Sequence, residues 1–245
     1  MCDDRPEKLM MSRREVLVLL GVTGASLLAG SSNAQPGAIK STSKKLPSCV
    51  VTPKQTEGPY FVDEHLNRAD IRLDPADGSV KAGALLTLGL RISAISRAGC
   101  TPLRGAIVDI WHCDAAGVYS HVTDESFNAV GKKFLRGYQV TNEHGEVQFT
   151  TIYPGWYPGR TVHIHFKIRA KSRSGRGYTF TSQLYFDDAI TDRVHAHPPY
   201  ASRGVRTMKN AGDGIFSEGG RQLILPLVER DQAYAGMFDV GLHMA

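Results

Sequence analysis

The sequence predicts an all-β protein: an antiparallel β-sandwich with long loops, forming a single domain after an N-terminal signal. Two observations predict this fold. Short β-prone runs are separated by turns rich in glycine, proline and asparagine. Between these runs, no long stretch shows the apolar period of a helix. Seven such runs without long helices are typical of two packed antiparallel sheets.

The expected strands are Leu85–Ser93, Gly105–Cys113, Phe134–Thr141, Val147–Ile152, Thr161–Arg169, Phe180–Phe186 and Gln222–Val228. In the second run, strict alternation places Trp111 and His112 on opposite faces of the strand. A short helix is expected over Asp187–Val194, where the paired acids Asp187 and Asp188 form a turn or helix cap rather than an acid–base couple.

The composition is that of an ordinary globular protein. With 42% hydrophobic and 22% charged residues, the chain is neither collagen-like nor wholly disordered. The 29 basic residues exceed the 24 acidic ones by only five and are scattered along the sequence. Because no block of lysine and arginine stands out, we expect no nucleic-acid partner.

The first 34 residues predict an export signal of the twin-arginine type. Arg13 and Arg14 stand before the apolar run Val16–Leu28, and small residues lead to a cleavage motif at Ser32–Ala34. The alternative, a buried N-terminal helix, is disfavoured by glycines within the run. Because 13 apolar residues are too few to span a bilayer comfortably, no stable membrane anchor is expected.

The predicted organisation is therefore a signal over residues 1–34, a polar linker over 35–50 and one globular domain over 51–245, which is periplasmic or secreted. Removal of the signal leaves Cys49, Cys100 and Cys113. In an oxidising compartment two of the three can pair, and their positions favour Cys49 with Cys100. The alternative is that all three are free.

The chemistry is concentrated around a histidine pair. Residues i and i+2 of a strand point to the same face, so His163 and His165 project side by side while Ile164 faces the core. Two imidazoles in this arrangement suit iron, copper or zinc. Taken alone, the pair is equally consistent with solvent-facing or hydrogen-bonded histidines.

Two tyrosines lie near this pair in the sequence. Tyr157 and Arg160 belong to a proline- and glycine-rich loop just before the histidines, and Tyr119 follows the strand that ends at Cys113. A tyrosine has a pKa near 10 and becomes a phenolate at neutral pH only beside a strongly polarising cation. Phenolate oxygen is a hard ligand, so it favours a ferric ion over zinc or cuprous copper.

Five stretches of the chain resemble, in order, the intradiol ring-cleavage dioxygenases, which are non-haem ferric enzymes related to protocatechuate 3,4-dioxygenase and catechol 1,2-dioxygenase. The stretches are Thr52–Phe61, Val108–Tyr119, Tyr157–His165, Ser182–Phe186 and Pro198–Phe216. The resemblance implies a β-sandwich fold, in agreement with the strand pattern. It also implies cleavage of a catechol-type ring by O2 between the two hydroxyl-bearing carbons, which gives a cis,cis-muconate-type product.

The resemblance also implies roles for individual residues. The ligands of a non-haem Fe(III) cofactor fall on Tyr119, Tyr157, His163 and His165. Tyr157, on its mobile loop, is the ligand that leaves when substrate arrives. Arg160 and Gln183 fall on the family's catalytic positions, where they offer positive charge and hydrogen bonds. Tyr60, in the Gly-Pro-Tyr turn, and Arg160 are the expected substrate-binding residues.

The chain departs from the family in two places. Only Pro158–Val162 separates the second tyrosine from the first histidine, which suggests a differently walled site mouth. The chain also lacks room for the N-terminal helical dimerisation segment of catechol 1,2-dioxygenases, and homo-oligomerisation stays open. A second histidine pair, His195 and His197, is interpreted as surface residues.

Two rival functions stay open. The first is a secreted, non-catalytic β-sandwich module that binds a carbohydrate or an aromatic polymer. The second is a zinc or copper enzyme that uses the same donors.

Overall fold

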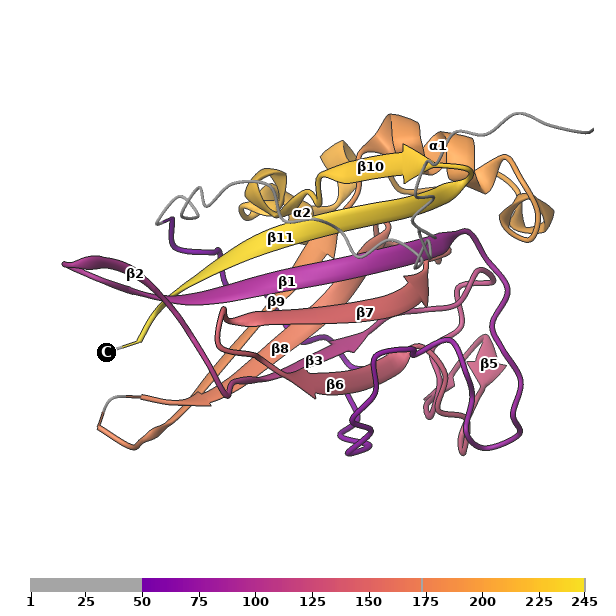
Figure 1. Ribbon diagram of the computed structural model, residues 1–245. Helices are drawn as coiled ribbons and strands as arrows, with labels where there is room; N and C mark the ends of the chain where they lie inside the picture. Colours follow the sequence, from indigo (N-terminus) through magenta and orange to yellow (C-terminus); the bar gives the residue numbers. More distant parts are fainter. Residues whose placement is uncertain (1–49, 173, 245) are drawn as a thin grey trace, which may run out of the picture. The chain divides into compact units, whose positions relative to one another are not determined.

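The computed structural model describes residues 50–172 and 174–244 (Figure 1). The predicted signal, the linker up to residue 49 and Cys49 itself lie outside these residues. Cys100 is disulfide-bonded and Cys113 is a buried free thiol, whereas the expected pairing of Cys100 with Cys49 stays a prediction. Within the described ranges, no helix has the length and apolar character needed to cross a membrane.

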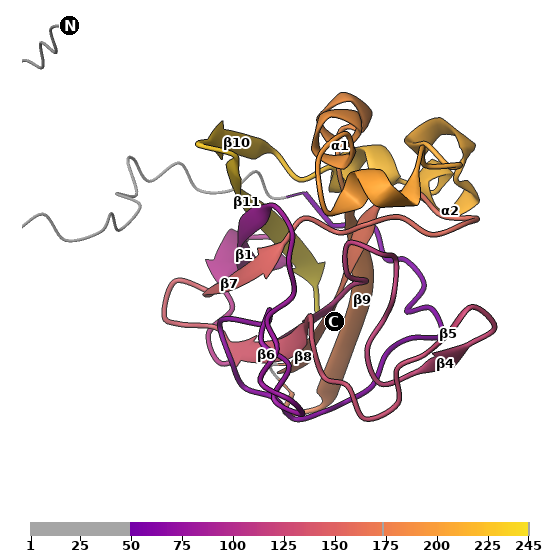
Figure 2. The ribbon, with the colours of Figure 1, turned by 90° about the vertical axis from the view of Figure 1, so that its right-hand side faces the viewer.

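Two sheets face each other, which confirms the predicted β-sandwich (Figures 1 and 2). The first sheet consists of β10 (Leu227–Arg230), β11 (Ala233–His243), β1 (Leu85–Ser96) and β2 (Gly99–Pro102), with β7 (Glu146–Ile152) also paired to β1. The second has the order β6 (Arg136–Val140), β3 (Ile107–Trp111), β8 (His163–Lys171) and β9 (Gly177–Tyr185). A small hairpin, β4 (Thr123–Asp124) with β5 (Phe127–Asn128), stands apart from both sheets.

The core lies between the inner faces of the two sheets. Alternate residues of the central strands β1 and β8 are fully buried there, as the period of two in a strand requires. These residues are Leu86, Leu88, Leu90, Ile164, Phe166 and Ile168. The second sheet is covered on its other face as well, because residues 52–68 run across it before the chain enters β1: Gln55 donates to the Thr181 carbonyl of β9, and Asn67 forms a bridge to Tyr138 of β6. This second burial was not expected from the sequence, and it is where the site lies.

The last strand differs from the prediction. Most of the expected strand Gln222–Val228 is irregular or 3₁₀-helical, and only its end enters β10. β11 was not predicted from the sequence; it runs parallel to β1, whereas the other pairs of named strands are antiparallel. Glycine lowers strand propensity, so the glycines of β11 weaken its strand pattern. At Gly241, however, only glycine fits, because a Cβ there would collide with the carbonyl oxygen of Val50.

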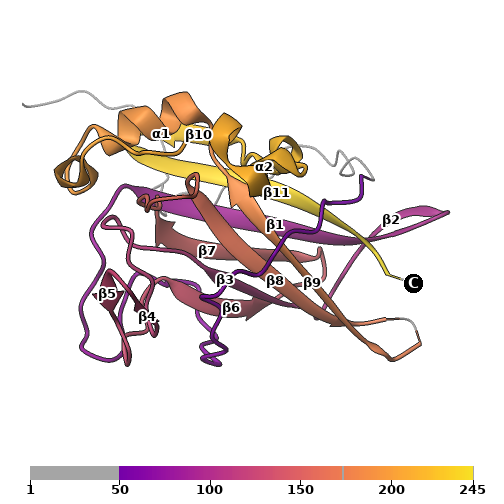
Figure 3. The same cartoon turned by 180° about the vertical axis from the view of Figure 1, so that it is seen from behind.

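Short helices connect β9 to β10, where Figure 3 shows them beside these two strands. The first is α1 (Asp188–His195), within one residue of the expected helix, and the Asp187 carboxylate caps it by accepting from the backbone N–H groups of Ala189 and Ile190. It is followed by η1 (Tyr200–Arg203), η2 (Asn210–Gly212), α2 (Gly214–Ser217) and η3 (Gly220–Leu223).

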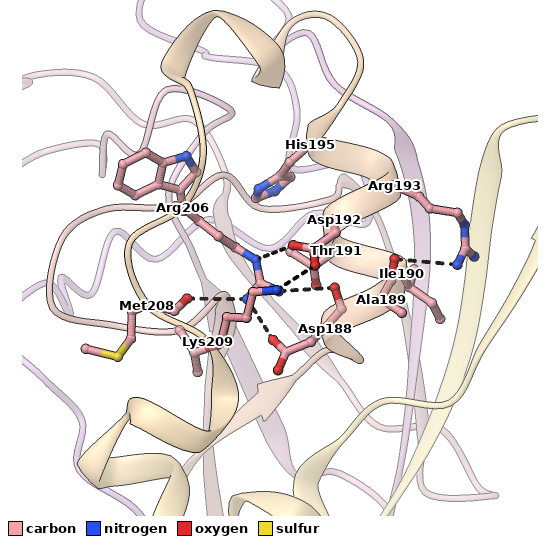
Figure 4. A network of polar contacts seen from close by, with 12 residues as sticks. Asp188, Ala189, Ile190, Thr191, Asp192, Arg193, His195, Arg206, Met208 and Lys209 are labelled. Atoms are coloured by element: carbon pink, nitrogen blue, oxygen red, sulfur yellow. Dashed lines mark hydrogen bonds and ion pairs between the residues drawn. The ribbon is translucent and has the colours of Figure 1, made fainter.

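A buried arginine fixes the segment after η1 against α1 (Figure 4). The side chain of Arg206 is 2% exposed; its Nη1 lies 2.7 Å from Asp188 Oδ1 and its Nε lies 2.9 Å from Asp192 Oδ1. Lys209 also reaches Asp192, at 2.9 Å, from a position that is 57% exposed. The two cations therefore share one carboxylate but differ sharply in burial.

We expect Arg206→Met to lower the free energy of unfolding by about 2 kcal/mol, since it leaves two carboxylates without their buried partner. The expected value is below that of a fully buried pair because the carboxylates are 32% and 46% exposed. Lys209→Met should change it by less than about 0.5 kcal/mol, as exposed ion pairs do. Urea denaturation measures both, and equal effects of the two variants would contradict the expectation.

Candidate metal centre

The two histidines of β8 lie side by side under a cover. The Nε2 atoms of His163 and His165 are 3.0 Å apart, and the two residues are 2% and 1% exposed. Gly58, with φ +71, lets the N-terminal segment lie close to them, since a Cβ there would be 3.3 Å from His165 Cε1. The Trp111 ring stacks on the His165 ring with centroids 4.9 Å apart. Neither contact was predicted from the sequence.

Tyr119 reaches the pair from the turn that follows β3. The Asp114 carboxylate shapes this turn by accepting from the backbone N–H groups of Ala116 and Val118, each at 3.0 Å. Gly117 takes a φ of +81, which glycine adopts without strain. As a result, the Oη atom of Tyr119, a residue 1% exposed, lies 3.5 Å from His163 Nε2.

Tyr157 approaches from the loop between β7 and β8, and its Oη lies 3.3 Å from the same His163 Nε2. The two tyrosine-bearing loops touch directly, because a Cβ at Gly155 would be only 2.5 Å from the carbonyl oxygens of Asp114 and Ala115. The structure thus brings together two phenol oxygens and two imidazole nitrogens, contributed by three separate parts of the chain.

The hydrogen bonds and burial fix the protonation of the histidines. His163 Nδ1 lies 2.6 Å from the carbonyl oxygen of Thr161, which can only accept, so Nδ1 carries the proton and Nε2 keeps its lone pair. Burial lowers the pKa of His163 to about 3 and holds the pKa of His165 well below its usual range. Both rings are therefore neutral at pH 7 and able to act as ligands.

Burial acts on the tyrosines in the opposite direction and raises the pKa of both Tyr119 and Tyr157 above the ordinary value of 10. Two phenols and two neutral imidazoles form a set of hard oxygen and intermediate nitrogen donors without net charge. This set fits a small, highly charged cation that can displace the phenol protons, as a ferric ion does. In the described ranges, no group of three or more histidine, cysteine, aspartate or glutamate side chains is arranged to bind a metal. A four-donor site here therefore needs the tyrosines.

Arg160 and Gln183 are linked next to this cluster. Arg160 Nη2 donates to Gln183 Oε1 at 2.6 Å, and Arg160 Nε donates to Asp213 Oδ2 at 2.8 Å. Gln183 is fully buried and donates to the carbonyl oxygen of Thr56 at 3.0 Å. Although burial raises the pKa of Asp213, hydrogen bonds from backbone N–H groups and from Arg160 hold it below its usual value. The sequence analysis assigned no role to Asp213.

Tyr60 forms one wall of the cluster. Its ring stacks on that of Tyr119, with centroids 4.5 Å apart, and meets the ring of Tyr157 edge-on at 6.4 Å. Its hydroxyl donates to Asp124 Oδ2 at 2.5 Å. Burial and this carboxylate raise the pKa of Tyr60 to about 12. The contact with Asp124, from the β4–β5 hairpin, could not be predicted because the two residues are far apart in sequence.

Only one histidine of the second pair is a surface residue. His197 is exposed, but His195 is only 8% exposed, so its interpretation as a surface residue is wrong. Its Nε2 donates to the carbonyl oxygen of Pro154 at 3.0 Å, and its ring stacks on Tyr200. These contacts bury the imidazole, and through the Pro154 carbonyl it supports the loop that carries Tyr157.

A β-sandwich in which two tyrosines and two histidines converge at one buried point has the donor set of a candidate metal centre. Comparison with known proteins shows to which family the chain belongs. The dioxygenase family model matches residues 56–204. The chain is 32% identical over 128 residues to the protocatechuate 3,4-dioxygenase beta chain of Burkholderia cepacia, a match that covers 46% of this chain and 53% of that protein. The chain thus matches only about half the length of this curated relative.

Solved structures agree with the sequence comparison. An intradiol ring-cleavage dioxygenase from Tetranychus urticae is 32% identical, with a TM-score of 0.67 over 80% of this chain and 95% of that one. The dioxygenase domain of a dioxygenase carbohydrate-binding protein fusion from Streptomyces sp. SirexAA-E is 31% identical, with a TM-score of 0.54 over 80% of this chain and 100% of that one. The chain belongs to the intradiol ring-cleavage dioxygenase family.

The contact between the two tyrosine loops makes Gly155 critical for the site. We expect Gly155→Ala to lower the free energy of unfolding by about 2 kcal/mol, because the added methyl group meets two backbone carbonyls that cannot rotate away. Gly214→Ala is the control, since a Cβ there meets nothing within 4 Å. Urea denaturation compares the two variants, and a Gly155→Ala protein as stable as the control would disprove the close contact.

Proposed function

We propose that this protein is a non-haem Fe(III) dioxygenase. It cleaves a catechol-type aromatic ring with O2 between the two hydroxyl-bearing carbons and forms a cis,cis-muconate-type product. The observation that carries the proposal is the convergence of two phenols and two neutral imidazoles: the Oη atoms of Tyr119 and Tyr157 and the Nε2 atom of His165 each lie within 3.5 Å of His163 Nε2. Membership of the family supports the same chemistry.

Tyr119, Tyr157, His163 and His165 would hold the iron. A bound ferric ion supplies Lewis acidity, which favours loss of the catechol protons and binding of both catechol oxygens. The protein's part is to present the donors in place. The Thr161 carbonyl fixes the tautomer of His163, and Trp111 packs flat on His165. Burial removes competing water from both imidazoles.

Tyr157 and Tyr119 differ in their exposure to solvent, which suits them to different roles as ligands. Tyr119 is fully buried beneath Tyr60, whereas Tyr157 is partly exposed on a loop that continues into the exposed residues Pro158 and Gly159. We therefore assign to Tyr157 the role of the ligand that yields its place to substrate. Its phenolate oxygen would then take up a proton, which the raised pKa of this side chain favours, while Tyr119 would stay in position.

Arg160 places a fixed positive charge beside the substrate oxygens. Its guanidinium is aligned by Asp213 and by Gln183, so no reorientation is needed when negative charge develops. Asp213 offsets part of the charge, and this leaves a directed hydrogen-bond donor rather than a free cation. The aromatic ring of Tyr60 gives the substrate ring an apolar surface on the Tyr119 side.

The cellular setting completes the proposal. The twin-arginine-type signal over residues 1–34 directs the protein to the periplasm or the exterior, where the Cys49–Cys100 disulfide would be stable. The substrates are a catechol-type small molecule and O2. A sandwich that only binds carbohydrate or an aromatic polymer has no use for buried phenols next to unprotonated imidazoles, so the enzyme is the better supported of the two functions.

Iron binding should release the phenol protons. Because burial keeps both tyrosines protonated in the metal-free protein and both histidines neutral, ferric loading at pH 7 is expected to release about two protons per iron from the ligands. Iron affinity should therefore fall as the pH is lowered. Tyr119→Phe and Tyr157→Phe should each release one proton fewer, whereas Tyr178→Phe, on β9 away from the cluster, should match the parent. A pH-stat titration measures this, and an unchanged count in both ligand variants would refute the assignment.

Turnover gives the direct test. Iron-loaded protein should be burgundy from tyrosinate-to-iron charge transfer and should consume one O2 per catechol in a catechol panel. The muconate-type products are identified by NMR, because products of ring opening between and beside the hydroxyl-bearing carbons have the same mass. Arg160→Gln is expected to lower kcat about 10²-fold, while Arg176→Gln, in the exposed turn before β9, leaves it unchanged. Colourless iron-loaded protein without O2 uptake would favour the binding module instead.

A further inference from the structure

The segment that follows α1 contacts the tyrosine loops without reaching the metal donors. Three side chains, that of His195 at the end of α1 and those of Tyr200 and Arg203 in the segment after it, each donate to a main-chain carbonyl oxygen of the loop that carries Tyr157. His195 donates to Pro154 at 3.0 Å and Tyr200 donates to Tyr153 at 2.7 Å. Arg203 donates to Trp156 at 2.7 Å. Side chains from α1 and the segment after it thus hold the backbone of the loop that carries Tyr157, a proposed ligand.

Arg203 makes the contact nearest to Tyr157. Its Nε donates to the carbonyl oxygen of Trp156, the residue before Tyr157, and its guanidinium carbon lies 4.9 Å from the centroid of the Trp156 ring. The Trp156 indole N–H in turn donates to the carbonyl oxygen of Gly204 at 3.3 Å. Trp156 is therefore held through both its main chain and its side chain.

The same guanidinium also lies against the loop that carries Tyr119. A Cβ at Gly117, two residues before that tyrosine, would be 3.3 Å from Arg203 Cζ and would collide with the carbonyl oxygen of Trp156. Gly117, Trp156 and Arg203 therefore form a three-way junction, at which one side chain contacts both tyrosine-bearing loops.

The segment that carries Arg203 is anchored to α1. Three residues after Arg203, the buried Arg206 is tied to Asp188 and Asp192 of α1 (Figure 4). The stacked rings of His195 and Tyr200, with centroids 5.0 Å apart, fill the space between α1 and the Tyr153 backbone. Arg203 thus projects from a fixed platform, although its own residue is exposed to solvent.

We infer that Arg203 is a positioning residue that sets the relative placement of the phenol oxygens of Tyr119 and Tyr157. The inference rests on the proposed function, in which both oxygens bind one ferric ion. A hydrogen bond from a charged donor and an aromatic stack are lost together when the guanidinium is removed. The two loops then lose their common contact, while every proposed ligand is still present.

The test compares Arg203→Gln and Arg203→Lys with Arg193→Gln in the full-length protein. Arg193 is the matched control because it lies on α1, is 59% exposed, pairs with Glu229 and points away from Arg206 in Figure 4. In iron-loaded Arg203→Gln we expect a shifted tyrosinate charge-transfer band and about tenfold faster iron loss to a chelator. Arg203→Lys should be intermediate, since lysine keeps the charge but not the planar stack. Arg193→Gln should match the parent.

A second readout needs no iron. Amide hydrogen exchange in metal-free Arg203→Gln should be faster in peptides that cover 114–119 and 153–157, and unchanged in β8. If Arg203→Gln matches Arg193→Gln in both band position and exchange, the inference is overturned. If the iron-loaded parent has no charge-transfer band, the proposed function fails, and the exchange comparison still decides whether Arg203 holds the two loops together.

Discussion

Polar groups are buried without charge on the face of the second sheet that points away from the core, and the rest of the structure supports that arrangement. Two phenols and two imidazoles share a space from which water is excluded, and burial drives each towards its neutral form. Neutral donors that are already desolvated and already close gain the most from a cation, because little solvation is lost when it binds. The sheet supplies two of these donors by strand periodicity, whereas the tyrosines depend on loops that must be fixed by other means.

The loops are fixed through the backbone. Main-chain carbonyls of the Tyr153–Trp156 segment accept hydrogen bonds from a segment about 45 residues further along the chain. Gly155 and Gly117 allow the two loops to interlock at distances that a side chain would prevent. On the far side, Arg160 is held by Asp213, which comes from the same helical connection between β9 and β10. That connection thus supports the site from two directions while contributing none of the proposed metal donors.

The sequence predicted what is local. Alternation identified six of the strands and the common face of His163 and His165, and an acidic cap identified α1. The parts it could not predict depend on contacts between distant residues. β11 was missed because glycines that suit close backbone packing weaken its strand pattern. The roles of Asp124, Asp213 and Arg203 come from pairings that only the folded chain creates. His195 was misinterpreted because a histidine next to prolines resembles a surface loop until the imidazole is seen under Tyr200.

The parallel pairing of β1 with β11 has a consequence for the order of assembly. The register runs from Leu86 opposite Tyr234 to Ile95 opposite His243, so the leucine-rich strand near the start of the sandwich is flanked by a strand that lies far behind it in the sequence and is synthesised much later. Until that segment arrives, one edge of β1 offers unpaired backbone groups beside apolar side chains, a surface prone to pairing with other chains. Such a long-range closure is slow. During the interval between synthesis of the two strands, the chain is therefore exposed to pairing with other chains through this edge.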